Sequence, residues 1–295
     1  MLRFRLDNSE YTRGVTWSAA FGALERTRHA VMHIPVSSDQ WSTCFNPQPA
    51  ATLRLICFAH AGGGAGVFST WHRALPSQIE LCAVQLPGRD LRRKEPFILD
   101  LNRLVDELLV ALAPMHDRPV ALFGYSLGGL LAFEYARALR RAKQPGPTQL
   151  IVGAARAPQR PPDPAIHKLA QADFVREMGA RYDGIPRAVL DDPELLAYFL
   201  PVIRADLALL DSYRYRQEPA LSCPITAFGG RDDKRITAQE VAFWEAQTSA
   251  AFSSRIFPGG HFFMTSARDQ LLSALSQTLA APRSTANGHA SSLTG

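Results

Sequence analysis

The strongest constraint on the fold lies at residues 122–129, which read Leu-Phe-Gly-Tyr-Ser-Leu-Gly-Gly. An apolar run over residues 120–123 precedes the motif, and an amphipathic helical pattern follows it to about residue 142. The order is therefore strand, tight turn, helix, with Gly-x-Ser-x-Gly in the turn. So sharp a turn strains the serine and needs small residues two positions away on either side, as Gly124 and Gly128 are. The motif predicts that Ser126 is a nucleophile exposed at the C-terminal edge of a sheet.

By itself the motif does not establish a nucleophile, because a chance match in a chain of this length is roughly a one-in-ten event at average glycine and serine usage. The alternative is an ordinary glycine-rich turn between a strand and a helix. Predicted strands alternate with predicted helices along the chain, which favours an α/β fold with a mostly parallel sheet covered on both faces. The strands are predicted at residues 53–58, 81–85, 120–123, 149–153, 224–228 and 254–257, and the helices at 101–112, from the end of the motif to about 142, near 237–248 and near 267–280.

About seventy residues between the predicted strands at 149–153 and 224–228 contain no strand pattern. Several prolines open this insertion, and helical patterns follow at about 171–180, 193–200 and 203–214. An insertion between sheet strands sits at the rim and commonly forms a lid or a substrate chamber. We therefore predict a helical lid over about residues 157–221.

Composition excludes several classes of protein. The 295 residues carry a formal net charge of +5 without a long basic block, so we expect no nucleic-acid partner. No run of 18 apolar residues occurs, so we expect no membrane span. The four cysteines form no Cys-x-x-Cys pair, and three lie in apolar runs, so we expect reduced thiols in a cytoplasmic protein, with no disulfide, metal or cofactor.

A nucleophilic serine needs a base, and the base needs an acid to orient it. His261 follows the predicted strand at 254–257 through a Pro-Gly-Gly turn, which puts it at the same edge of the sheet as Ser126. Asp232, which follows the predicted strand at 224–228, is the preferred acid, and Asp233 is the second choice. Asp206 in the insertion is a third candidate, with a buried ion pair to Arg204 or Arg214 as its structural alternative.

The oxyanion of such a reaction needs two backbone N–H donors. Leu127, directly after the serine, is expected to supply one. The loop that begins His60-Ala61-Gly62-Gly63 follows the first clear strand, and Ala61 is expected to supply the other. His60 is interpreted as a structural hydrogen bonder. A phosphate-binding loop is the rival interpretation of these glycines, but neither Gly-x-Gly-x-x-Gly nor Gly-Lys-Ser/Thr is present.

Six segments together resemble the type II thioesterases of polyketide and nonribosomal peptide synthesis, in order over about residues 40–280. The segments are Phe-Ala-His-Ala-Gly-Gly at 58–63, Gln-Leu-Pro-Gly-Arg at 85–89, Gly-Tyr-Ser-Leu-Gly-Gly at 124–129, Pro-Val-Ile-Arg-Ala-Asp at 201–206, Gly-Gly-Arg-Asp-Asp-Lys at 229–234 and Gly-Gly-His-Phe-Phe at 259–263. The resemblance implies an α/β-hydrolase fold with a helical lid. It also implies an editing hydrolase that removes stalled acyl groups from the phosphopantetheine arm of carrier proteins. Tyr125 stands where the family often has histidine, a change that we expect to be tolerated.

The fold and the triad would equally serve a small-ester or lipid hydrolase, and a catalytically silent binding protein is a further alternative.

We expect a monomeric domain over residues 41–281. Residues 1–40 are interpreted as an extension that is either disordered or upstream of a true start at Met32, and residues 282–295 as a disordered tail. The resemblance further implies a carrier protein of a commonly acidic kind, so we also expect some arginines to flank the pocket mouth and attract the carrier. The candidates are Arg89, Arg92, Arg93, Arg156 and Arg160.

Overall fold

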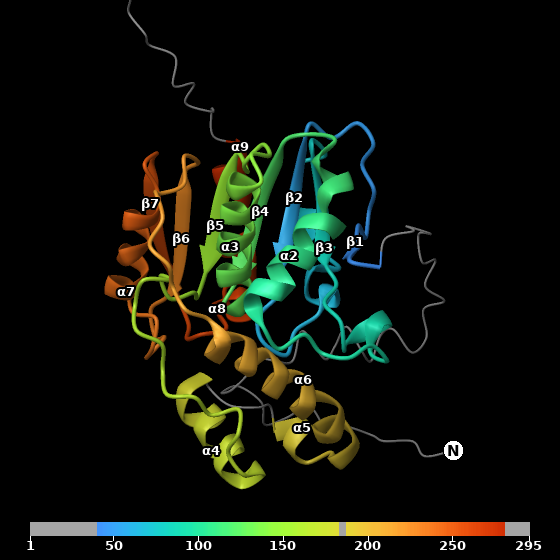
Figure 1. Ribbon diagram of the computed structural model, residues 1–295, viewed down its shortest axis with the longest axis vertical. Coiled ribbons are helices and arrows are strands. Elements are labelled where there is room, and N and C mark those ends of the chain that lie inside the picture. Colours follow the sequence, from blue (N-terminus) through green and yellow to red (C-terminus); the bar gives the residue numbers. More distant parts are fainter. Residues whose placement is uncertain (1–39, 183–186, 281–295) are drawn as a thin grey trace, which may run out of the picture.

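A seven-stranded sheet forms the centre of the protein (Figure 1). The computed structural model describes residues 40–182 and 187–280. In space the strands follow the order β1-β3-β2-β4-β5-β6-β7; β1 is antiparallel to β3, and all other neighbours are parallel. The strands are β1 (Ser42–Thr43), β2 (Leu53–Phe58), β3 (Ile79–Val84), β4 (Val120–Tyr125), β5 (Gln149–Gly153), β6 (Ile225–Gly230) and β7 (Phe252–Phe257).

Helices cover both faces of this sheet, as the sequence predicted (Figure 1). Successive side chains of a strand point to opposite faces. In β4, Leu122 therefore packs with helices α2 and α3, whereas Phe123 and Tyr125 pack on the side of α9. The α-helices are α2 (Leu101–Ala111), α3 (Leu127–Arg141), α4 (Gln171–Tyr182), α5 (Arg187–Leu190), α6 (Pro193–Ser212), α7 (Ala238–Ala242), α8 (Phe263–Ser266) and α9 (Arg268–Ala280). The 3-10 helices are η1 (Ala65–Phe68), η2 (Trp71–Ala74), η3 (Asp90–Arg92), η4 (Ala113–His116) and η5 (Phe243–Gln247).

The predicted insertion contributes α4, α5 and α6, which lie across the end of the sheet where the parallel strands terminate (Figure 1). These helices share a small apolar core of their own, which includes Phe174, Met178, Ile203 and Leu207. The sequence predicted two helices separated at Pro201, but α6 is one helix that contains this proline. A proline inside a helix removes one backbone hydrogen bond, and here the buried residues that follow Pro201 hold the helix together in spite of that loss.

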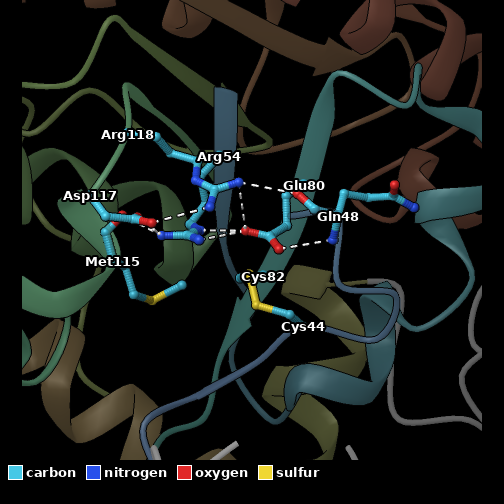
Figure 2. The surroundings of a disulfide bond; sticks show 8 residues. All are labelled: Cys44, Gln48, Arg54, Glu80, Cys82, Met115, Asp117 and Arg118. Atoms are coloured by element: carbon cyan, nitrogen blue, oxygen red, sulfur yellow. Dashed lines mark hydrogen bonds and ion pairs between the residues drawn. A yellow bond between two sulfur atoms is a disulfide. The ribbon is translucent and has the colours of Figure 1, made fainter. Parts of the chain in front are cut away.

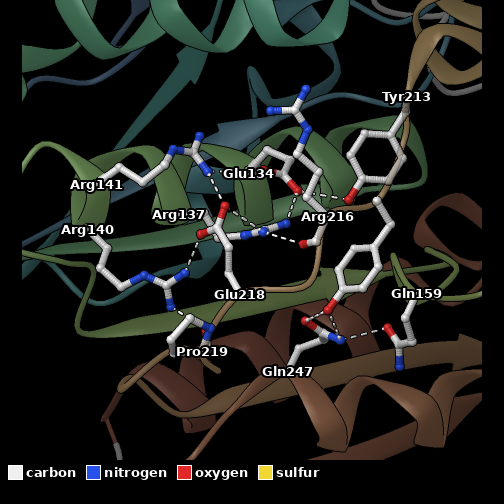
Figure 3. Close-up of polar contacts among 11 residues, drawn as sticks. Glu134, Arg137, Arg140, Arg141, Gln159, Tyr213, Arg216, Glu218, Pro219 and Gln247 are labelled. Atoms are coloured by element: carbon white, nitrogen blue, oxygen red, sulfur yellow. Dashed lines mark hydrogen bonds and ion pairs between the residues drawn. The ribbon is translucent and has the colours of Figure 1, made fainter.

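The chain that leaves α6 is bound tightly to α3, the helix that follows the Gly-x-Ser-x-Gly turn (Figure 3). The buried guanidinium of Arg137 pairs with Glu134 at 2.6 Å and with Glu218 at 2.7 Å. Tyr213 donates its hydroxyl hydrogen to Glu134 at 2.8 Å, and Arg140 adds an ion pair to Glu218 at 2.6 Å. The C-terminal end of the insertion is therefore fixed to the body of the protein.

A disulfide joins Cys44 to Cys82 and corrects the expectation that all four cysteines are reduced (Figure 2). No sequence pattern indicated β1, because a strand of two residues has no measurable period. Since Thr43 pairs with Ala83 in antiparallel register, Cys44 comes to lie beside Cys82. Cys57 and Cys223 are free and buried, as expected for small apolar side chains.

Reduction of this disulfide is expected to destabilise the protein substantially. The bridge closes a segment of 38 residues, for which the chain-entropy treatment gives roughly 4 kcal/mol. Urea unfolding with and without dithiothreitol measures the difference. The matched control is the double variant Cys44→Ser, Cys82→Ser, which should unfold like the reduced protein and ignore the reductant. Equal midpoints for the oxidised and reduced wild type would contradict the expectation.

Residues 1–39 of the predicted extension (1–40) and the whole of the predicted tail (282–295) lie outside the described residues. None of the helices in the described ranges combines the length and the apolar character needed to cross a membrane.

Candidate active site

The Gly-x-Ser-x-Gly turn has the backbone that the sequence predicted. Ser126 directly follows β4 and has φ 54° and ψ −116°, a strained conformation for a residue with a side chain. A Cβ atom on Gly124 would lie 2.1 Å from the carbonyl oxygen of Gly128, and one on Gly128 would lie 2.1 Å from the carbonyl oxygen of Phe58. Both glycines are therefore required by close backbone contacts, and they hold Ser126 at the tip of the turn.

His261 reaches this serine from the loop that follows β7. Its Nε2 atom lies 3.1 Å from Ser126 Oγ, and its Nδ1 atom lies 2.8 Å from Asp233 Oδ2. His261 and Asp233 are both buried, whereas Ser126 is partly exposed. The three side chains form one line of hydrogen bonds that ends at the partly exposed serine.

The acid beside His261 is Asp233, which corrects the preference for Asp232. Strand β6 continues two residues beyond the predicted end, to Gly230, so the turn brings the second aspartate back to the histidine. Asp232 is exposed and uses its backbone N–H to bond Gly259.

The surroundings of Asp233 favour its charged form. Its Oδ1 atom accepts the backbone N–H groups of Arg235 and Ile236, at 2.9 and 3.0 Å. Burial raises the pKa of this carboxyl, but the hydrogen bond and the charge of His261, together with the two N–H groups, outweigh burial and leave the pKa below its usual value. A carboxylate held in this way orients the imidazole with Nδ1 as the hydrogen-bond donor.

The two expected oxyanion donors lie next to the turn. Leu127 is the first residue of α3, so its N–H has no acceptor within the helix. The end of β2 packs on the first turn of α3 through Gly128 and Phe58, which brings the loop that contains Ala61 alongside. In that loop the Gly62 N–H is bonded to Asp206 at 2.7 Å and the Gly63 N–H to the His60 carbonyl at 2.9 Å.

His60 is a buried histidine whose Nδ1 atom lies 2.9 Å from the Ala61 carbonyl. Burial lowers its pKa to about 4, so the imidazole is neutral near pH 7 and Nδ1 is the donor of this bond. This agrees with the structural role expected from the sequence.

Asp206, the third candidate acid, belongs to another contact. It is fully buried on α6, and the Arg89 guanidinium donates a hydrogen bond to each of its two carboxylate oxygens, both at 2.6 Å. The expected partners Arg204 and Arg214 are therefore wrong, and Arg89 takes their place. The same carboxylate accepts the Gly62 N–H, so it ties α6 to the loop that holds Ala61.

Loss of the Asp206 carboxylate is expected to cost stability more than turnover. Asp206→Ala leaves the Arg89 guanidinium buried without its anion, and breaking such a pair costs about 3–5 kcal/mol. Urea unfolding gives this loss, and kcat per folded molecule should fall far less than in an Asp233 variant. The control is Asp232→Ala, an exposed carboxylate, which should change stability by less than about 0.5 kcal/mol. A kcat loss in Asp206→Ala as large as that of an Asp233 variant would instead assign Asp206 to the reaction.

Most of the arginines that were expected to attract a carrier are already paired. Arg89 and Arg92 are buried, so they cannot present charge at the surface. Arg93, by contrast, is exposed, and so is the neighbouring Lys94. The pairs are Arg89–Asp206, Arg92–Glu95, Arg156–Asp163 and Arg160–Glu240.

Within residues 40–182 and 187–280, the side chains that lie close enough to share a metal ion are Cys44, Glu80 and Cys82. The two sulfurs are joined to each other, and Glu80 is paired with the buried Arg54 (Figure 2). This group therefore offers no thiolate ligand as it stands.

Residues 53–279 match the family described as "Thioesterase domain", which is most of the chain. The chain belongs to the thioesterase domain family. Together with its relatives, this membership makes the protein an enzyme of the class that hydrolyses thioesters with a serine.

Several relatives of this thioesterase come from peptide and polyketide biosynthesis. Gramicidin S biosynthesis protein GrsT of Aneurinibacillus migulanus is 36% identical over 242 residues, which is 82% of this chain and 94% of the relative. Thioesterase PikA5 of Streptomyces venezuelae is 35% identical over 249 residues, 84% of this chain and 88% of the relative. The structure of the type II thioesterase BorB from the borrelidin biosynthetic cluster superposes with a TM-score of 0.72 at 35% identity, covering 83% of this chain and 98% of that one. The α/β-hydrolase fold predicted from the sequence is thereby confirmed.

Proposed function

We propose that this thioesterase is a stand-alone editing enzyme, which hydrolyses aberrant or stalled acyl groups from the phosphopantetheine arm of acyl or peptidyl carrier proteins. The observation that carries the proposal is the line of hydrogen bonds from Ser126 through His261 to Asp233. The names of the relatives, a gramicidin S biosynthesis protein and a type II thioesterase of a biosynthetic cluster, support the choice of substrate.

In the first half of the proposed reaction, Ser126 Oγ attacks the thioester carbonyl while His261 Nε2 takes the hydroxyl proton. Backbone N–H groups of Ala61 and Leu127 stabilise the resulting oxyanion. As the intermediate collapses, the carbon–sulfur bond breaks and the imidazolium returns its proton to the departing thiolate. The acyl group is then esterified to Ser126, and the free pantetheine thiol remains on the carrier.

In the second half, His261 removes a proton from water as the water oxygen attacks the acyl-serine ester. The carbon–oxygen bond to Ser126 then breaks, and the imidazolium protonates the serine oxygen. The acyl group leaves as a carboxylic acid. Asp233 stays ionised throughout and stabilises each imidazolium, as its lowered pKa favours.

The test compares three substrates that bear the same acyl group: its thioester on a carrier protein, its thioester with free pantetheine, and its ethyl ester. We expect the highest kcat/KM for the acylated carrier protein and the lowest for the ethyl ester. Ser126→Ala should abolish turnover of all three. Faster hydrolysis of the ethyl ester than of either thioester would instead favour the small-ester or lipid hydrolase. A wild-type protein that turns over none of the three would favour the binding protein.

Carrier docking is measured separately by the effect of salt, because exposed charges act on association and are screened over about 8 Å at physiological ionic strength. We expect kcat/KM for the carrier substrate to fall as salt rises, and kcat/KM for acyl-pantetheine to change little. Reversal of the exposed charges with Arg93→Glu and Lys94→Glu should reproduce the salt effect. Equal salt responses of the two substrates would remove charge attraction from the proposal and leave the hydrolytic chemistry intact.

A fatty acyl substrate is the second candidate, because three of the relatives are medium-chain S-acyl fatty acid synthase thioesterases. The medium-chain S-acyl fatty acid synthase thioesterase of Rattus norvegicus is 32% identical over 227 residues, 75% of this chain and 85% of the relative. Acyl-pantetheines from two to twelve carbons distinguish the two candidates. A kcat/KM maximum at medium chain length would favour fatty acyl release, and a preference for short chains would favour editing.

A further inference from the structure

Tyr125 occupies a position that touches both halves of the proposed reaction centre. It is the last residue of β4, so its carbonyl carbon is bonded directly to the nitrogen of Ser126. Its side chain is fully buried and points to the face of the sheet that α9 covers. A polar side chain in this position must find hydrogen-bond partners inside the protein.

The partners of the Tyr125 hydroxyl lie in the loop that carries His261 and in α8, the short helix that directly follows this loop. The hydroxyl donates to the carbonyl oxygen of His261 at 2.6 Å and accepts the backbone N–H of Met264 at 3.2 Å. Burial raises the pKa of Tyr125 well above its ordinary value, so the hydroxyl keeps its proton and stays a donor. One hydroxyl thus bonds to His261 in the loop and to Met264 in the first turn of α8, three residues further along the chain.

Aromatic contacts hold the tyrosine ring at a fixed position. Its ring centroid lies 5.2 Å from that of Phe263, which in turn stacks on Phe257 at 5.2 Å. Phe257 is the last residue of β7, so this row of rings joins the ends of two strands that are not neighbours in the sheet. Packing against these rings therefore fixes the position of the Tyr125 ring independently of the hydrogen bonds that its hydroxyl makes.

The loop between β7 and His261 needs such a restraint. It contains Gly259, at φ 104°, and Gly260, and glycine has more backbone freedom than any other residue. The hydrogen bond between His261 Nε2 and Ser126 Oγ, at 3.1 Å, depends on the position of this loop relative to the turn at Ser126. A misplacement of about 1 Å can lower the rate of an enzyme by roughly 100-fold.

We infer that Tyr125 is a positioning residue, whose hydroxyl holds the His261 loop at the distance from the Gly-x-Ser-x-Gly turn that the contact between His261 and Ser126 requires. The inference rests on the proposed function, since it assumes that His261 is the base. Tyr125 acts through the backbone of His261 and does not touch the substrate.

Tyr125→Phe tests the inference, because it keeps the ring and removes only the hydroxyl. We expect kcat for acyl-pantetheine to fall by about 10- to 100-fold while KM changes by less than about threefold. The matched control is Tyr135→Phe. Tyr135 is equally buried, and its hydroxyl is bonded to His116 Nε2 at 2.8 Å, but it lies on α3 away from the loop. This control should lose comparable stability and keep its kcat.

Active-site titration with a fluorophosphonate separates positioning from folding. A purely structural role would lower the number of titratable sites and leave kcat per site unchanged, and that result would overturn the inference. Wild-type kcat in Tyr125→Phe would overturn it as well. Ser126→Ala is assayed beside these variants, because activity in that variant would refute the proposed triad, whereas an inactive Ser126→Ala with a fully active Tyr125→Phe would refute only the role of Tyr125.

A second variant keeps the hydroxyl and moves the ring. A Cβ atom on Gly153 would lie 2.7 Å from Cδ2 of Tyr125, so Gly153→Ala must shift the aromatic ring. We expect a fall in kcat per titrated site with little change in KM, as in Tyr125→Phe. An unchanged kcat per site in Gly153→Ala would contradict the inference even if Tyr125→Phe does not fold.

Discussion

Ser126→Ala and His261→Ala are each expected to lower kcat by roughly 10⁴- to 10⁶-fold, and the double variant should be scarcely worse than either. The reason is the 3.1 Å contact between Ser126 Oγ and His261 Nε2, through which the two side chains act as one unit. Without the hydroxyl there is nothing for the base to activate, and without the base the serine is a weak nucleophile. Steady-state hydrolysis of acyl-pantetheine by the three variants gives the comparison.

Thermal unfolding of each variant serves as the control, since both substitutions remove only a few atoms and should leave the fold intact. If the two losses multiplied in the double variant, the residues would act independently and the proposed triad would be wrong. A small loss of kcat in His261→Ala alone would indicate another base, and the buried, neutral His60 would be the next candidate.

Asp233→Asn is expected to lower kcat by about 10⁴-fold, as the same change does in serine proteases. The substitution preserves size but replaces the carboxylate that accepts the Nδ1 hydrogen of His261 at 2.8 Å. An amide that donates to Nδ1 holds the imidazole in the wrong tautomer and gives no charge to stabilise the imidazolium. The pH dependence of kcat and the rate at the optimum are both measured, so that a shifted profile is not mistaken for a lost rate.

Asp232→Asn is the matched control, one residue away and exposed. We expect it to change kcat by less than about threefold. The reverse ranking of the two aspartates would restore the assignment made from the sequence alone and would mean that the loop after β6 rearranges when substrate binds.

The fold was largely predictable because its signals are local. Strands such as β2 and β5 are buried apolar runs, and the turn at Ser126 carries its requirement for glycine in its own sequence. By contrast, no local signal distinguished Asp232 from Asp233 as the partner of His261. The choice depended on β6 continuing through two glycines to Gly230, and glycine carries no strand signal.

Partners of charged side chains were the least predictable feature. Arg89 and Arg93 are four residues apart, yet the first is buried against Asp206 from α6 and the second is exposed. Both carry the same charge and lie in the same short segment after β3. What separates them is a contact between segments more than a hundred residues apart, which no local pattern encodes.

The two ends of the sheet bear on how this protein behaves at high concentration. An open edge strand offers unpaired N–H and C=O groups on which another molecule can add a strand. At one end, β1 pairs with β3 over only two residues and is held there by the Cys44–Cys82 bridge, so it presents a very short ladder that cannot easily be displaced. At the other end, β7 exposes Ser253, Ser254 and Arg255. Polar and charged side chains on an edge strand disfavour edge-to-edge aggregation, and this applies to β7. At the other edge, the disulfide that holds β1 in place disfavours aggregation as well as stabilising the fold.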